Sequence, residues 1–177
     1  DTKISSNLRG PTFNGKNIDL TKYALKDEYD DRRQGYKIYN CVLKSEVSMT
    51  LEQKLKITTG SEEEQEKYFT EIRSRTFHAH VYSKEISDFN KHEIINFSRK
   101  LSILSQINHP AILNFIGYSP VDFDNKNKPV ILTEYSFCEI DNISENYDYT
   151  RRLICLYGIA SAMAYLRSHG IIHRDLK

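Results

Sequence analysis

The chain has 177 residues, which is enough for one sizeable hydrophobic core, or for one lobe and part of a second. Its 39% hydrophobic and 28% charged residues are typical of a globular protein. Lys and Arg number 25 against 24 Asp and Glu. The resulting net charge of +1, with basic residues scattered along the chain, excludes a global field that would attract nucleic acid or an anionic membrane.

The cysteines and histidines do not form a metal-binding or disulfide pattern. Cys41, Cys138 and Cys155 are odd in number and widely spaced. His92 and His109 are too far apart in the sequence to suggest a metal site. The longest apolar run, near Leu153–Leu166, is too short and too interrupted to cross a membrane. We therefore expect reduced thiols in a cytoplasmic protein without a metal centre.

The first part of the chain changes from polar to β-rich. Residues 1–18 are polar and contain two glycines and a proline, so we expect a disordered leader. The aromatic stretch Tyr36–Leu43 predicts a strand, preceded by an acidic cluster at Asp27–Asp31. Residues 44–75 are charged and have few bulky apolar side chains. They predict an insertion or an exposed helix.

A second strand and an amphipathic helix follow. Thr76–Tyr82 predicts the strand. Asn90, with Glu93 three residues later, can form a capping box at the start of a helix. That helix carries one apolar stripe, formed by residues at spacings of three and four: Ile94, Phe97, Leu101 and Leu104. Asn108-His109-Pro110 is expected to end it.

The remaining elements complete an α+β pattern. Two short strands are predicted at 111–118 and 129–135, then a polar connector over 136–149. Residues 150–168 predict a helix that is apolar on most sides, as a core helix would be. Strands come first with one helix among them, and a mostly helical part follows, which predicts an α+β fold in two lobes.

The last residues bring an aspartate and a lysine together. After Gly170 the chain reads Ile-Ile-His-Arg-Asp-Leu-Lys, so Asp175 lies two residues before Lys177. Phosphoryl transfer from ATP to a hydroxyl needs such a pair, because the carboxylate orients the hydroxyl and the ammonium neutralises phosphate charge. The string resembles the catalytic loop of eukaryotic protein kinases.

The resemblance extends along the chain in the order of the kinase domain. Residues 101–110 resemble the end of the kinase C-helix and its His-Pro turn, and residues 129–135 resemble the fifth strand and hinge. Residues 156–166 resemble the helix before the catalytic loop in the tyrosine-kinase-like group, and Lys177 matches the serine/threonine pattern. The resemblance is strong over residues 94–177 and weak before them.

This resemblance implies a truncated kinase domain. A small β-rich N-lobe with one C-helix would span 19–135, with 44–75 as a charged insertion. The hinge connector and the first, helical part of the C-lobe would span 136–177. The family implies transfer of the ATP γ-phosphoryl group, with Mg²⁺, to Ser or Thr of a protein substrate. The oligomeric state is left open.

The resemblance also assigns site residues. In the catalytic loop, Asp175 would orient the acceptor hydroxyl and Lys177 would steady the phosphate. His173 would be a buried packing residue, beneath a hydrophobic stack that includes Leu104 and Phe115, and Arg174 would bind an activation-loop phosphate.

Three residues of the fifth strand and hinge would form the adenine end of the site. Thr133 would be the gatekeeper, and the Glu134 carbonyl and Ser136 amide would face adenine.

The ATP-binding motifs depart from the family. With Ile38 in place of the valine that follows the glycine-rich loop, the three glycine positions hold Asp31, Arg33 and Tyr36. Only Gly35 is nearby, and one glycine does not make a phosphate cradle.

The ion pair that normally holds the phosphates is also changed. His80 occupies the third-strand lysine position, and Lys100 occupies the C-helix glutamate position, from which its ammonium would reach the phosphates from the other side. His78 replaces a small residue that packs on adenine, so it would fill part of the pocket.

These residues are compatible with three functions. The first is a protein kinase-like fragment, and the second is a pseudokinase that binds partners without catalysis. The third is a truncated remnant, whose helical part would leave the apolar side chains of Ile159, Met163 and Leu166 uncovered. In each case we expect that the 177-residue chain alone transfers no phosphate.

Overall fold

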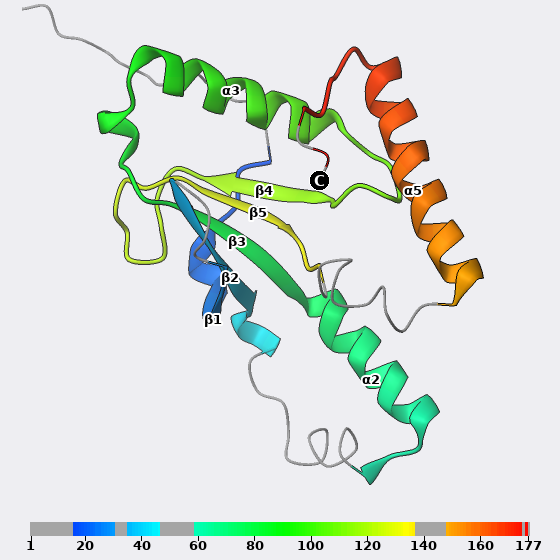
Figure 1. The fold of residues 1–177 in the computed structure, drawn as a ribbon. Coiled ribbons are helices and arrows are strands. Elements are labelled where there is room, and N and C mark those ends of the chain that lie inside the picture. The colour runs from blue at the N-terminus through cyan, green and yellow to red at the C-terminus, as the bar shows by residue number, and fades with distance from the viewer. Residues whose placement is uncertain (1–15, 31–34, 47–58, 137–147, 175, 177) are drawn as a thin grey trace, which may run out of the picture.

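The computed structural model describes residues 16–30, 35–46, 59–136, 148–174 and 176 (Figure 1). Five strands form one antiparallel sheet in the order β1-β2-β3-β5-β4. The strands are β1 (Tyr23–Asp30), β2 (Tyr36–Leu43), β3 (Thr76–Tyr82), β4 (Phe115–Ser119) and β5 (Val130–Glu134). The α-helices are α2 (Glu62–Arg75), α3 (Lys91–Gln106) and α5 (Tyr149–Ser168). The predicted α+β class is confirmed.

Both faces of the sheet bury apolar side chains. Successive residues of a strand point to opposite faces, so Ile131 of β5 faces one way and its neighbours Val130 and Leu132 the other. The face covered by α3 holds the first cluster: Phe97, Leu101, Phe115, Tyr118 and Ile131. The opposite face holds the second cluster: Leu20, Cys41, Ala79, Val130 and Leu132. The central strands β3 and β5 therefore separate two halves of the core.

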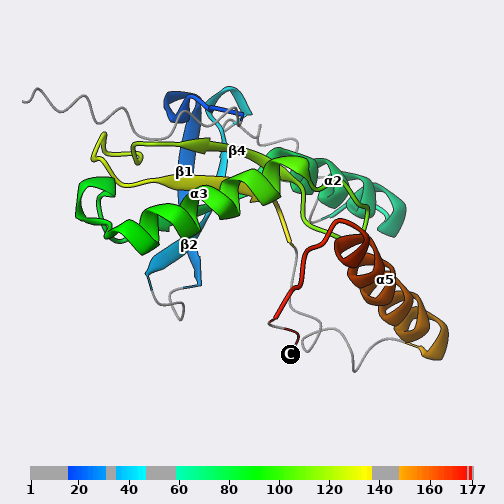
Figure 2. The same cartoon turned by 90° about the horizontal axis from the view of Figure 1, so that it is seen from above.

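Helix α3 begins and packs as its sequence predicts. Asn90 Oδ1 accepts hydrogen bonds from the backbone N–H groups of His92 and Glu93, and the Glu93 carboxylate accepts from Asn90 N–H at 2.8 Å. This is the predicted capping box. Phe97 and Leu101 are buried, and Leu104 packs against the same cluster. Figures 1 and 2 show α3 lying across one face of the sheet.

The strand predicted over 111–118 begins later, at Phe115. The chain first makes a turn, in which Ile112 N–H donates to the His109 carbonyl at 3.0 Å and Ala111 N–H donates to His109 Nδ1 at 3.1 Å. These bonds hold the backbone of 109–112 in a turn, so it cannot join the sheet. The strands predicted at 36–43 and 76–82 are confirmed, and β5 lies within the one predicted at 129–135.

Strand β1 was not predicted as a separate strand. Its sequence includes Lys26, Asp27 and Glu28, and its pairing with β2 shifts register twice. It lies at an edge of the sheet, where charged side chains and register shifts are tolerated because one side faces solvent. Edge placement therefore explains why the strand lacks an apolar alternation.

Part of the predicted leader lies beside the sheet. Residues 1–15 are outside the described residues, but Ile18 N–H donates to the Tyr118 carbonyl and Tyr118 N–H donates to the Lys16 carbonyl, both at 2.9 Å. A Cβ on Gly117 would lie 2.5 Å from the Lys16 carbonyl oxygen and would clash with the Ile18 side chain. Glycine at 117 is therefore what allows residues 16–18 to approach β4.

Half of the predicted charged insertion forms a helix. Residues 47–58 are outside the described residues, and Glu62–Arg75 form α2, which leads directly into β3. Ser61 Oγ accepts from Glu64 N–H at 3.3 Å, and Glu64 Oε2 accepts from Ser61 N–H at 3.0 Å. The three glutamates of the first turn also favour a helix N-terminus, because its partial charge is positive.

Helix α5 meets the rest of the chain through the turn after α3. Tyr165 Oη accepts from Asn108 N–H at 3.1 Å, and His109 Nε2 lies 3.2 Å from Ser161 Oγ. Because His109 Nδ1 accepts from Ala111, its Nε2 carries the proton and donates to Ser161. This turn is thus the hydrogen-bonded junction between α5 and the α3 end of the sheet.

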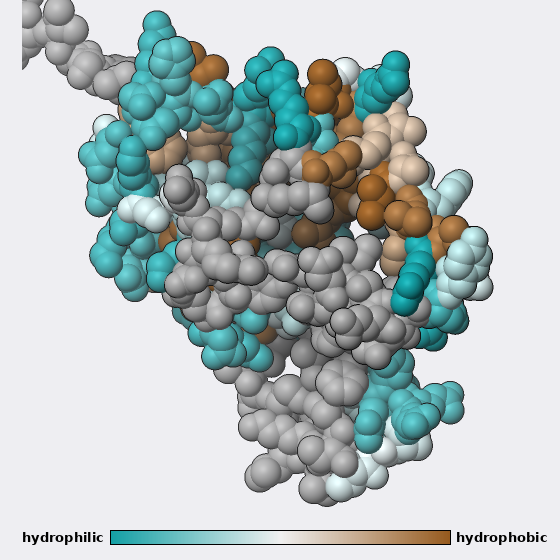
Figure 3. Space-filling view, in the orientation of Figure 1, coloured by the Kyte–Doolittle hydropathy of each residue, from teal (hydrophilic) through white to brown (hydrophobic). Residues whose placement is uncertain are grey.

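The interior position expected for α5 is wrong for this chain. Only Ala162 and Leu166 of the helix are buried. Its large exposed side chains are Tyr149, Leu153, Ile154, Leu156, Tyr157 and Ile159. The physical reason is that α5 lies beside the sheet and contacts the turn after α3, so most of its surface faces no described element (Figures 2 and 3). Ile159 is 41% exposed, as expected for an uncovered face, whereas Leu166 is buried. No described helix is both long and apolar enough to cross a membrane.

Candidate functional site

The residues expected to hold ATP gather on the α3 face of the sheet. Ile38 pairs with His80 across β2 and β3, and His78 pairs with Thr133 across β3 and β5. Cross-strand partners point to the same face, so these four side chains form one continuous patch. Ile38, His78 and Thr133 are all buried. Three expected site residues, Ile38, His80 and Thr133, are thus brought together, with His78 among them.

His80 contacts the gatekeeper position. Its Nε2 lies 3.2 Å from Thr133 Oγ1, within hydrogen-bonding distance, and its ring centroid lies 5.6 Å from that of Tyr36. A lysine at this position would extend an ammonium beyond the strand, whereas the shorter imidazole contacts its neighbour on the sheet. His80 therefore links β3 to β5.

His78 lies in the space where a small residue would leave room for a flat ring. Its side chain is only 3% exposed, and its ring meets Tyr135 edge to face at 5.0 Å. Burial lowers the pKa of His78 below its usual value, so the imidazole stays neutral. The prediction that His78 fills part of the pocket is consistent with this packing.

Lys100 extends from α3 toward two tyrosines. Its Nζ donates a hydrogen bond to Tyr82 Oη at 3.1 Å, and lies 5.0 Å from the ring centroid of Tyr36 and 5.5 Å from that of Tyr82. An ammonium over aromatic faces is attracted by their negative π-electron density. Burial, with a smaller effect of nearby Tyr36, raises the pKa of Tyr82, so its hydroxyl stays protonated.

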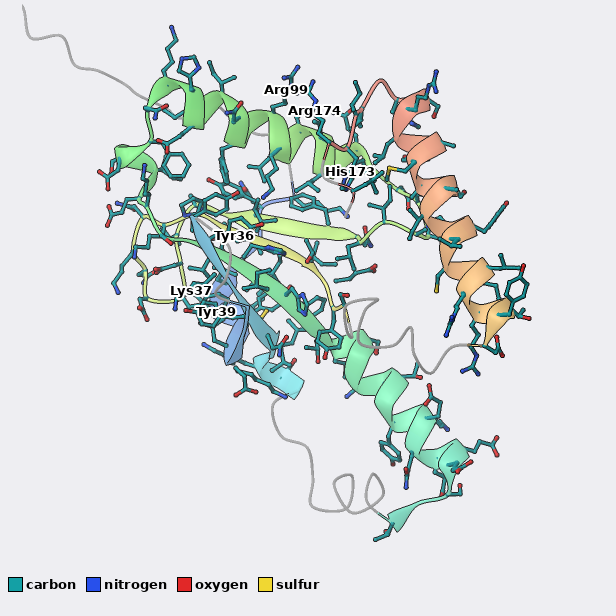
Figure 4. All side chains as sticks on the ribbon, in the orientation of Figure 1. Tyr36, Lys37, Tyr39, Arg99, His173 and Arg174 are labelled. Atoms are coloured by element: carbon teal, nitrogen blue, oxygen red, sulfur yellow. The ribbon has the colours of Figure 1, made fainter. Side chains whose placement is uncertain are left out.

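The contact of Lys100 with Tyr36 and Tyr82 was missed by sequence reasoning, although a signal existed. Tyr36 and Tyr82 are directly paired in the β2–β3 register, so strands predicted at 36–43 and 76–82 would place them side by side if paired end to end. Figure 4 shows Tyr36 at the start of β2, with Lys37 and Tyr39 farther along the strand. The rings of Tyr36 and Tyr82 are 5.5 Å apart.

The expected adenine contacts lie at the end of β5. Glu134 N–H donates to the Asn114 carbonyl at 2.9 Å, which attaches β5 to the residues before β4. Ser136 is half-buried two residues after the strand. The roles of the Glu134 carbonyl and the Ser136 amide stay predictions, as does that of Thr133.

The segment that resembles the catalytic loop returns from α5 toward α3 (Figures 1 and 4). Asp175 and Lys177 are outside the described residues, so their roles stay predictions. Arg174 is exposed, with a φ of 64°, in the left-handed region that non-glycine residues seldom adopt. The expected burial of His173 is wrong, since its side chain is exposed. Leu104 and Phe115 do share one apolar cluster, but that cluster lies between α3 and the sheet and does not include His173.

The residues present do not fit the phosphate end of ATP. The family's clamp is a lysine–glutamate ion pair, and here the two positions hold His80 and Lys100. His80 is bonded to Thr133, and Lys100 is directed at Tyr36 and Tyr82. Neither position supplies a carboxylate, so the family's lysine–glutamate ion pair cannot form between them. Within the described ranges, no three His, Cys, Asp or Glu side chains are grouped so as to hold a metal ion.

Comparison with known proteins finds that the chain is similar to protein kinases. The chain is 33% identical over 97 residues to human NUAK family SNF1-like kinase 1, covering 50% of this chain and 13% of that protein. It is 33% identical over 94 residues to mouse serine/threonine-protein kinase TNNI3K, covering 49% of this chain and 11% of that protein. It is 33% identical over 122 residues to the probable serine/threonine-protein kinase kinY of Dictyostelium discoideum, covering 59% of this chain and 21% of that protein.

The chain spans about a tenth to a fifth of the length of these relatives. The profile of the family described as protein tyrosine and serine/threonine kinase matches residues 49–177. Kinases of this family generally use ATP and Mg²⁺ and act on protein substrates. The sheet order, the position of α3 and this match agree, and the chain belongs to the protein tyrosine and serine/threonine kinase family.

Proposed function

We propose that this chain acts as a pseudokinase-type module, a kinase fold that binds partners and does not transfer phosphate. The observation that carries the proposal is the state of the two clamp positions. His80 hydrogen-bonds to Thr133 at 3.2 Å, and Lys100 hydrogen-bonds to Tyr82 at 3.1 Å. Both side chains are engaged within the fold, and neither pair contains an acid.

Electrostatics support this proposal. Catalysis of phosphoryl transfer depends on positive charges that are fixed before the reaction at the positions of the phosphate oxygens. An imidazole at 80 cannot reproduce a lysine ammonium that reaches the phosphates, and Lys100 lies over two aromatic rings. His78 also occupies space beside Thr133, where the family's small residue would leave room for adenine.

The second candidate is ATP-dependent phosphorylation of protein Ser or Thr by a longer protein that contains this chain. The observation that favours it is the intact His-Arg-Asp-Leu-Lys string at residues 173–177. The printed names of the relatives also describe serine/threonine kinases. The two candidates differ first in nucleotide binding, because an active kinase must bind Mg-ATP before it can transfer phosphate.

Thermal unfolding of the 177-residue chain with and without Mg-ATP tests the proposal. A ligand that binds only the folded state stabilises it by RT ln(1 + [L]/Kd), about 2.7 kcal/mol at a hundredfold excess over Kd. We expect no shift in Tm for the natural chain. A clear, saturable rise in Tm with Mg-ATP would contradict the proposal and favour the second candidate.

A matched variant tests whether the named residues are the cause. His78→Ala, His80→Lys and Lys100→Glu together restore the family's residue types at all three positions. We expect this variant to gain a Tm shift with Mg-ATP that the natural chain lacks. If the variant folds by circular dichroism but also shows no shift, these three positions do not explain the loss.

The compartment and partners are part of the same proposal. Cys41 is a buried free thiol and Cys155 is a half-buried one, which fits a reducing, cytoplasmic environment. The near-neutral charge favours a protein partner over nucleic acid.

A further inference from the structure

The two edges of the sheet are protected from pairing with a further strand in different ways. Strand β1 carries charged side chains and its pairing with β2 shifts register twice, and both features discourage strand addition. Strand β4 has the sequence Phe-Ile-Gly-Tyr-Ser, without a charged side chain. Residues 16–18 lie along its outer edge instead, and we call them the edge segment. The edge of β4 is thus protected by a covering segment.

The edge segment pairs with β4 as a short parallel strand. Tyr118 N–H donates to the Lys16 carbonyl, and the Tyr118 carbonyl accepts from Ile18 N–H, both at 2.9 Å. Within the described ranges this pairing is a single bridge, between Asn17 and Tyr118. The outer edge of β4 therefore already binds an extended main chain, and it does so through a short pairing that can be replaced by another strand.

Gly117 makes room for this second main chain. Its φ is outside the left-handed region, so the conformation of β4 does not require glycine there. A Cβ at this position would lie 2.5 Å from the Lys16 carbonyl oxygen and would clash with the Ile18 side chain. Glycine inside a strand weakens the strand, and it often marks a place where another backbone approaches closely. The close approach of the edge segment explains the glycine.

The edge segment is attached to the rest of the domain through Leu20. This side chain is buried in the apolar cluster on the face opposite α3, and Ile18 packs against the same cluster. Tyr23 then begins β1 at the other edge of the sheet. The attachment keeps the edge segment at a high local concentration beside β4. The segment therefore competes with any strand that another molecule presents to this edge.

We propose that the edge of β4 is a docking site for an extended segment of a partner protein, and that the edge segment is the internal competitor that covers it. The partner would run parallel to β4 and pair with Tyr118 through a carbonyl and an N–H two residues apart. A branched apolar side chain would lie over Gly117, as Ile18 does. Strand addition to a sheet edge is a general mode of peptide recognition. The proposal goes beyond the pseudokinase function and does not depend on it, because neither clamp position lies on β4.

A synthetic peptide with the sequence of residues 14–22 is the probe, because this sequence fits the edge in the structure. Its binding to the 177-residue chain is measured by fluorescence anisotropy. Ile18→Ala in the chain weakens the competitor and leaves β4 unchanged, so it should tighten peptide binding roughly tenfold. Asn17→Ala, at an exposed position of the edge segment, is the control and should keep the natural affinity. Equal affinity of the natural chain and Ile18→Ala, or no binding to either, overturns the proposal.

Two glycine variants locate the bound peptide. Gly117→Ala places a Cβ in the space that the added main chain needs, so it should abolish peptide binding. Gly158→Ala on α5 is the matched control, since its Cβ would meet Ala111 Cβ at an ordinary 3.6 Å, and it should keep the binding. If both variants bind alike, the peptide lies elsewhere and the proposal is wrong. Self-association of the natural chain that Gly117→Ala abolishes would show that a second copy occupies the edge, contrary to the proposal.

Amide hydrogen exchange of the natural chain covers the case in which a variant does not fold. Ile18 and Tyr118 lose their hydrogen bonds together when the edge segment leaves. Their N–H groups should therefore have similar protection factors, at least about tenfold below those of β5, which is paired on both sides. Excess peptide should raise the protection of Tyr118 and lower that of Ile18, because the peptide replaces the edge segment. Protection of Ile18 as high as that of β5 would show that the segment does not leave, and overturns the proposal.

Discussion

His78 is the residue at which the fold most clearly changes the chemistry of a single side chain. The imidazole is buried between the sheet and Tyr135, and burial lowers its pKa below 6.5. The unfolded chain keeps an ordinary histidine pKa of about 6.5. As pH falls through that value, His78 is protonated in the unfolded state while it is still neutral in the folded state. The free energy of unfolding therefore decreases.

Acidification should therefore destabilise the protein partly through His78. Between about pH 7.5 and about pH 5.5, the free energy of unfolding of the natural chain should fall, and His78→Phe should reduce this fall because Phe does not titrate. Urea denaturation at the two pH values measures this change in the free energy of unfolding. His92→Gln, at an exposed position of α3, is the control and should keep the natural pH dependence. The same slope in His78→Phe as in the natural chain would contradict the assignment.

At the scale of elements, α3 depends on its first turn as well as on its apolar stripe. The capping box of Asn90 and Glu93 satisfies backbone N–H groups that would otherwise lack partners at the helix start. The same turn brings Glu93 Oε1 to 2.9 Å from Lys84 Nζ, in the segment between β3 and α3. Local sequence thus sets where α3 begins, and the start of α3 is linked to the segment that follows β3.

Loss of the cap should weaken the whole domain. Asn90→Ala should lower the free energy of unfolding by about 1 kcal/mol, the usual effect of removing an Asn cap. Urea denaturation followed by circular dichroism measures the change. Asn96→Ala, in the exposed middle of the same helix, should cause no loss because alanine favours helix. A similar loss in both variants would show that the cap contributes nothing of its own.

At the scale of the whole molecule, α5 leaves an apolar surface in contact with solvent. Ile154 is 64% exposed and Tyr157 is 76% exposed, one helical turn apart. Figure 3 shows brown, hydrophobic side chains gathered on the side of the molecule that α5 forms. Exposed apolar area of this kind favours association between molecules, because association removes it from water.

The natural chain should therefore self-associate as its concentration rises. Ile154→Glu with Tyr157→Glu should reduce the association, measured as mass by sedimentation velocity or light scattering. Ile95→Glu introduces a glutamate at an exposed isoleucine of α3 and should leave the association unchanged. If the natural chain stays monomeric at every concentration, the surface of α5 does not drive association.

The sequence by itself determined the elements whose stability is local. Strands β2 and β3, the capping box of α3 and the extent of α5 depend on alternation, helical spacing and cap residues within a few positions. The family followed from motif strings, which are also local. Strand β1 was not predicted because a strand at the edge of the sheet does not need the alternation of apolar and polar residues by which strands are recognised.

Only the tertiary structure decided which chemistry the site residues have. Lys100 meets Tyr82 across 18 residues of sequence, and His80 meets Thr133 across 53. Burial of His78 and exposure of His173 likewise depend on elements distant in sequence. Sheet pairing and the packing of α3 set these distances, and hydrogen bonding and desolvation act only once the groups are brought together.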